Sequence, residues 1–243
     1  MSHRDIDHCV LLGFGRDVCS SALISMVNMS LLGDGSPQEQ LARVDDELHE
    51  WCRSHGLKRP SGNRLSLRAL GRAESSHAYP ELSTTWKAKA CKTLIMFVAY
   101  KTERVCRTGD FQKLVATCCW GLADFLNCLD EAGISLDETE RGRALQSGRL
   151  CLLSLQALCV ISKQLGLWLW RLRPKCHYFD HIVRTLAACS LNPAMFGTLR
   201  GEDALGKLKR IGKGCDRRTA SLRILQCWLL WQSVRLQNRG RLI

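Results

Sequence analysis

The sequence predicts an all-α protein: an irregular multi-helix bundle around a central apolar helix, with little or no β-strand. Three observations support this prediction. Apolar residues recur at helical spacing along most of the 243 residues, helix-capping signals divide the chain into segments, and the stretch from about 135 to 170 has almost no polar face. A chain of this length can bury a sizeable core without a structural metal or disulfides.

The capping signals and composition divide the chain into three segments. We expect an N-terminal helical segment over residues 1–56, a basic connection containing glycine and serine over 57–79, and the main helical bundle over 80–243, whose last third is basic. In the first segment Ser36 is a candidate N-cap with Pro37 at the first helical position, a pairing typical of helix starts.

Within the main bundle, helices are expected over about residues 83–106 and 110–131. Ser135 and Glu138 match the S-x-x-E capping box and predict the start of a helix that runs to about residue 170. Leucine, valine and isoleucine residues of that helix are distributed over nearly all of its sides, so we expect it at the centre of the bundle. Another helix is expected to begin at Pro174, and two basic helices are expected near residues 202–211 and 216–238.

The segment 150–172 is apolar enough to suggest a membrane span. Lys163 and the neighbouring side-chain amides, however, would be costly in hydrocarbon. We therefore expect a buried helix and no membrane partner.

Charge is the clearest functional signal. The net charge is +12, and residues 171–243 hold 15 Lys and Arg against 4 Asp and Glu, so that this third carries +11. Concentrated positive charge favours polyanions such as nucleic acid, although a basic face can also simply be solvated.

The fourteen cysteines lie mostly in apolar, helix-like runs, and the chain contains no C-x-x-C pair. We interpret them as reduced, buried small hydrophobes in an intracellular protein. His177 and His181 are four residues apart, so that both face one side of a helix and could share a metal ion. A closed zinc site needs two further ligands, and packing or capping roles suit the histidines equally well. We expect no bound zinc and no other cofactor.

Three short motifs occur in a characteristic order: "RPKCHYFDHI" at 173–182, Asn192–Pro193, and "GEDALGKLKR" at 201–210. Together with "YPELSTTWKAKACKTL" upstream, they resemble the end of eukaryotic DNA-transposon proteins of the CACTA and Kyakuja-Dileera-Zisupton kind. The resemblance covers about residues 79–243. It implies an RNase H-like core with a helical insertion, in which three carboxylates bind two divalent ions such as Mg²⁺.

Glu202 matches the last of those carboxylates, and Lys175, His177 and His181 match the helical segment that precedes it. The upstream strand-borne aspartates are not found, so the chain alone is not expected to be an enzyme. We expect a transposase-derived helical domain that binds the DNA backbone through its basic last third, in the nucleus. The expected DNA-binding residues are Lys207, Lys209, Arg210, Lys213, Arg217 and Arg218.

Its other partner would be a missing RNase H-like core or another protein, and Mg²⁺ would matter only within a complete transposase. The alternative is a non-enzymatic helical interaction module with no role in nucleic-acid binding.

Overall fold

The computed structural model describes residues 5–60, 64–72 and 77–197, and scattered residues between 209 and 230. The chain divides into two compact units, Met1–Gly197 and Thr198–Ile243, here called the helical unit and the basic unit. The boundaries expected at residues 56 and 79 both lie inside the helical unit.

The described residues of the helical unit form six α-helices and two short helices of other types. In chain order they are η1 (Asp7–Phe14), α1 (Gly15–Asn28), α2 (Pro37–Ser54), α3 (Ala88–Val105), α4 (Asp110–Glu131), α5 (Glu138–Gln164), α6 (Pro174–Thr185) and η2 (Pro193–Phe196). The described residues contain no β-strand, and one isolated bridge joins Ser135 to Leu191. The all-α prediction is therefore confirmed.

Local signals account for where several helices begin. Ser36 caps α2 by accepting a hydrogen bond from the backbone N–H of Glu39, and Pro37 is the first helical residue, as predicted. The helix predicted over 110–131 is α4, with those bounds.

The predicted start of α5 is wrong by two residues. Its capping box consists of Asp137 and Glu140 rather than Ser135 and Glu138. Ser135 lies in the extended segment that pairs with Leu191, and its hydroxyl donates to the carbonyl oxygen of Ser190 at 3.3 Å instead of capping the helix. The predicted end near residue 170 is also wrong: α5 ends at Gln164, and Gly166 adopts φ +67°, a conformation that glycine tolerates and that closes a helix.

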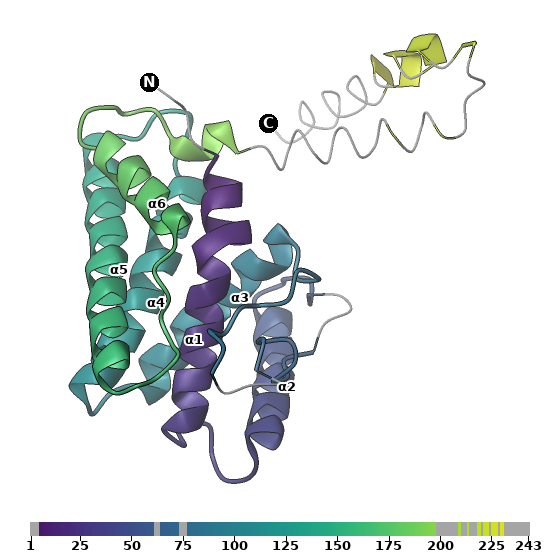
Figure 1. The fold of residues 1–243 in the computed structure, drawn as a ribbon. Coiled ribbons are helices and arrows are strands. Elements are labelled where there is room, and N and C mark those ends of the chain that lie inside the picture. Colours follow the sequence, from purple (N-terminus) through teal and green to yellow (C-terminus); the bar gives the residue numbers. More distant parts are fainter. Residues whose placement is uncertain are drawn as a thin grey trace. The chain divides into compact units, whose positions relative to one another are not determined.

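The central helix is α1 together with η1, not α5 as the sequence analysis expected. Figure 1 shows this segment, drawn in purple, between α4, α5 and α6 on one side and α2 and α3 on the other. All residues of α1 from Gly15 to Val27 are buried. Ser20, Ser21 and Ser25 are buried with the apolar residues of α1, because small side chains let neighbouring helices approach closely.

Small residues bring α5 close to α4 and explain why α5 is not central. A Cβ placed on Gly121 of α4 would lie 2.8 Å from the carbonyl oxygen of Ser147 and 2.9 Å from the backbone nitrogen of Cys151. The buried face of α5 consists largely of such small side chains, including Ser147, Gly148, Cys151 and Ser154. Leu153 and Val160 are left exposed on its outer side.

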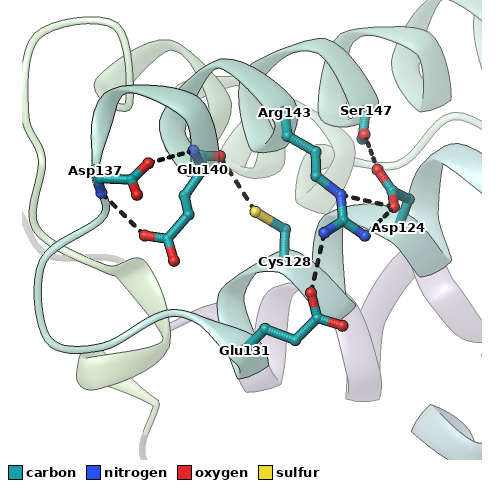
Figure 2. Close-up of polar contacts among 7 residues, drawn as sticks. All are labelled: Asp124, Cys128, Glu131, Asp137, Glu140, Arg143 and Ser147. Atoms are coloured by element: carbon teal, nitrogen blue, oxygen red, sulfur yellow. Dashed lines mark hydrogen bonds and ion pairs between the residues drawn. The ribbon is translucent and has the colours of Figure 1, made fainter.

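Polar contacts at the α4–α5 hairpin fix how the two helices are rotated about their axes (Figure 2). The guanidinium of Arg143 donates to Asp124 at 2.6 Å and to Glu131 at 2.9 Å. Ser147 donates to the other carboxylate oxygen of Asp124, and the Cys128 thiol donates to the Glu140 carbonyl at 3.2 Å. Two α4 carboxylates thus hold one α5 arginine.

Candidate nucleic-acid interface

The basic unit is the part of the chain with the charge needed for a nucleic-acid interface. Residues 198–243 contain eleven Lys and Arg and three Asp and Glu. The described cations of this unit are all exposed: Lys209, Lys213, Arg218 and Arg223. Four predicted site residues, Glu202, Lys207, Arg210 and Arg217, lie outside the described residues.

The described residues between 221 and 230 are helical, in agreement with the basic helix predicted over 216–238. Leu222, Leu225 and Leu229 follow one another at spacings of three and four and therefore share one side of this helix. Each is more than half exposed within the described structure. The described part of this helix thus has an exposed apolar side, Arg223 lies within it, and Arg218 lies in the turn before it.

Lys175, from the transposase-like "RPK" motif, has a structural role in the helical unit. Its ammonium donates to the carbonyl oxygens of His8 at 3.0 Å and Leu12 at 3.2 Å. Those carbonyls lie beside a break in η1, where Gly13 leaves helical geometry at φ −119° and ψ −127°. An ammonium can donate three hydrogen bonds, so Lys175 satisfies acceptors that the distorted helix leaves open.

Arg173 of the same motif joins a buried carboxylate to a surface carboxylate. Its Nε lies 3.0 Å from Oδ2 of Asp17 on α1, and its terminal nitrogens donate to Glu81 at 3.2 and 2.5 Å. Burial raises the pKa of Asp17 to about 7 although the Arg173 charge opposes the rise. Neither Asp17 oxygen accepts a hydrogen bond within the described residues, so the arginine contact is an ion pair without the directional bond that would offset desolvation. The hydrogen bond from Arg173 lowers the pKa of Glu81.

This cluster was missed in the sequence analysis. Arg16 and Asp17 are adjacent charges inside the otherwise apolar run from Cys9 to Val27, and that interruption is the signal that could have found them. Arg16 donates to the carbonyl oxygen of Trp86 at 2.6 Å. Together with Asp17 it ties the segment before α3 and the start of α6 to the central helix. The cluster therefore fixes the position of α6 against the central helix.

The structure brings His177 and His181 together on α6. Their Nε2 atoms are 2.9 Å apart and the rings meet edge to face at 4.3 Å between centroids. One neutral imidazole can donate to the other, which gives the pair a role without a metal. Within the described residues, three possible metal ligands lie close together on α2, at Asp45, Asp46 and His49. The pair of His177 and His181 belongs to no such set of three within the same residues. The absence of zinc stays a prediction.

The set on α2 has a structural explanation. Asp45 is buried and accepts a hydrogen bond from the backbone N–H of Leu65 at 3.0 Å. Leu65 and Leu70, which belong to the predicted connection, are both fully buried. Asp45 therefore holds the connection against α2.

The fold and the charge distribution together define an all-α protein with a helical unit and a separate, strongly basic unit. Comparison with protein-family models, characterised proteins and solved structures found no match.

Proposed function

We propose that the basic unit binds the phosphate backbone of duplex DNA and that the helical unit has no catalytic part in this. The observation that supports the proposal is the concentration of eleven Lys and Arg against three Asp and Glu within 46 residues. Every described cation among them is exposed. Guanidinium and ammonium groups neutralise phosphates and release condensed counterions, which supplies affinity without reading bases.

The transposon-like motifs favour DNA over other polyanions and a nuclear location. In this proposal the chain descends from a transposase and retains DNA contact without strand transfer. A two-metal site needs several carboxylates, whereas Glu202 has Asp203 as its nearest acidic neighbour in a segment that otherwise carries positive charge. The proposed activity is therefore binding alone, without Mg²⁺.

The test is a fluorescence-anisotropy titration of a labelled duplex with the full chain and two matched variants. The first variant carries Lys209→Gln, Arg210→Gln, Arg217→Gln and Arg218→Gln in the basic unit, and is called the quadruple variant. The control removes the same number of cations from exposed positions of the helical unit: Arg53, Lys58, Lys89 and Arg107. Circular dichroism checks that both keep their helix content.

We expect the quadruple variant to bind at least tenfold more weakly at moderate salt, since each lost phosphate contact removes a counterion-release contribution. The control should bind within about threefold of the parent because a charge that makes no phosphate contact acts only through a screened field. Equal losses in both variants would refute an interface in the basic unit.

A second candidate function rests on the exposed leucines of the same unit. Leu222, Leu225 and Leu229 suit the apolar face of a protein partner's helix. If the parent shows no duplex binding at low salt, a helical interaction module without a nucleic-acid role is the better account.

A further inference from the structure

The outer side of α5 and the loop that follows it carry several exposed apolar side chains. We call this set the outer stripe; its members and exposed fractions are Leu153 (65%), Val160 (50%), Leu165 (63%), Leu167 (37%), Trp168 (44%) and Leu172 (49%). Leu153 and Val160 are seven residues apart, or two helical turns, and so lie on one side of α5. Large exposed apolar areas on soluble domains mark interaction surfaces.

The orientation of this stripe is set by the packing on the opposite side of α5. Gly148 is fixed inward because a Cβ there would lie 2.5 Å from Cγ2 of Val183. Arg143 and Ser147 bind Asp124 of α4 (Figure 2). The helix therefore cannot turn its leucines toward the core without breaking these contacts.

The loop part of the outer stripe is also anchored. The Trp168 ring meets Tyr79 edge to face at 5.4 Å, and Arg72 donates to the Trp168 carbonyl at 2.8 Å. Arg171 lies over the Tyr79 ring at 5.7 Å. Trp168 and Tyr79 are both partly exposed, so an aromatic pair with an arginine beside it stands at the end of the stripe.

The chain segment that carries the outer stripe contains cations and no acids. Residues 141–179 include seven Lys and Arg and no Asp or Glu, and two of the cations, Arg143 and Arg173, are paired with carboxylates of other segments. Arg149 and Lys163 are exposed and share the helix side of Leu153 and Val160, so that a cation stands at each end of the α5 part. The occupant of this surface is therefore apolar with an anionic boundary.

We infer that the outer stripe docks on the interface of an anionic lipid bilayer. Leucine and tryptophan side chains enter the headgroup boundary, where tryptophan and tyrosine are favoured, while Arg149, Lys163 and Arg171 reach anionic headgroups. A second copy is a poorer occupant, because an antiparallel α5 pair centred on Gln156 would set Arg149 against Lys163 of the other copy. The expectation of no membrane partner relied on the cost of Lys163 and the neighbouring side-chain amides in hydrocarbon, which argues against a membrane span and not against binding at the bilayer interface.

The experiment is co-sedimentation of the full chain with phosphatidylcholine vesicles that contain or lack phosphatidylserine. The basic unit can itself attract anionic vesicles, so all proteins carry the quadruple variant's substitutions. The test variant adds Leu153→Glu and Val160→Glu. The control adds the same two charges as Ser54→Glu and Asn127→Glu, which line the hollows over α2, α3 and α4.

We expect binding to phosphatidylserine vesicles by the background protein and the control, and a loss of roughly tenfold or more in the test variant, which places two carboxylates in the interface. Arg149→Gln with Lys163→Gln should reduce the preference for phosphatidylserine while the helical spectrum is unchanged.

Equal binding by test variant and control, or no binding by the background protein, would overturn the inference. Analytical ultracentrifugation tests the other occupant. If the background protein is a dimer and the test variant is a monomer, the outer stripe binds a second copy of the chain. None of these outcomes depends on DNA binding.

Discussion

Arg173 and Asp17 form an ion pair between α6 and the central helix, with 3.0 Å between Nε and Oδ2, and Asp17 is 3% exposed. The carboxylate accepts no hydrogen bond within the described part of the chain. Burial therefore dominates its electrostatics, and the arginine only partly offsets the desolvation.

The first prediction concerns the pH dependence of stability. Since the pKa of Asp17 is about 7 in the folded protein and its ordinary value is 3.8, the folded state binds more protons than the unfolded state between those pH values. Its contribution to the free energy of unfolding is then greatest below pH 3.8, declines as pH rises to about 7, and is constant above that. Asp17→Asn should flatten this decline. Urea unfolding of both proteins at several pH values from 4 to 8 checks it, and parallel pH profiles would contradict it.

The second prediction compares two glycines of α5. Gly148→Ala should destabilise the helical unit by about 1–3 kcal/mol, because the added methyl group meets Val183 and Phe125. Gly142→Ala is the matched control: no atom lies within 4 Å of its added Cβ, so it should gain about 0.5–1 kcal/mol from helix propensity. Chemical denaturation measures both. A Gly148→Ala protein as stable as Gly142→Ala would contradict the close α5–α6 packing.

A third prediction concerns thiol reactivity. Ten cysteines of the described chain are buried and free, and Cys227 is exposed. Burial raises the pKa of Cys91 to about 12 and of Cys106 to about 11, so their reactive thiolates are scarce. With a thiol reagent at pH 8, a minority of the fourteen cysteines should react quickly in the native protein and all fourteen after denaturation. Rapid reaction of most thiols without denaturant would exclude the buried, reduced arrangement.

Helix positions could be predicted where local chemistry alone decides them. The N-cap at Ser36 and the bounds of α4 depend on neighbouring residues, and both were read correctly from the sequence. The start and end of α5 were misplaced because Asp137 is as good a cap as Ser135, and because Gly166 was passed over as a helix end.

Which helix lies at the centre depends on how closely its neighbours can approach. The large apolar residues of α5 predict burial on every side, whereas Gly121 and Gly148 decide which side of α5 is buried. The Arg173–Asp17 pair joins residues far apart in sequence. Spacing rules do not reach such pairs, so this part of the site required the structure.

The fourth prediction concerns Glu202, which the transposon resemblance matches to a catalytic carboxylate. Glu202→Gln removes a negative charge from the basic unit, so duplex binding without divalent metal should be unchanged or slightly tighter. The anisotropy titration measures it, with Asp216→Asn as a comparison of equal charge change. Weaker binding by Glu202→Gln alone would indicate that this carboxylate supports the binding surface.

The central claim is that the basic unit binds DNA by neutralising backbone phosphates, and the salt dependence of the parent protein's affinity tests it most directly. The logarithm of the association constant should fall linearly with the logarithm of salt concentration, with a slope of about −4 to −8 for a surface that contacts a similar number of phosphates. The quadruple variant should have a slope shallower by about three to four, and duplexes of unrelated sequence should give the same values. A parent slope near zero, or one that the four substitutions leave unchanged, would contradict backbone binding through the basic unit.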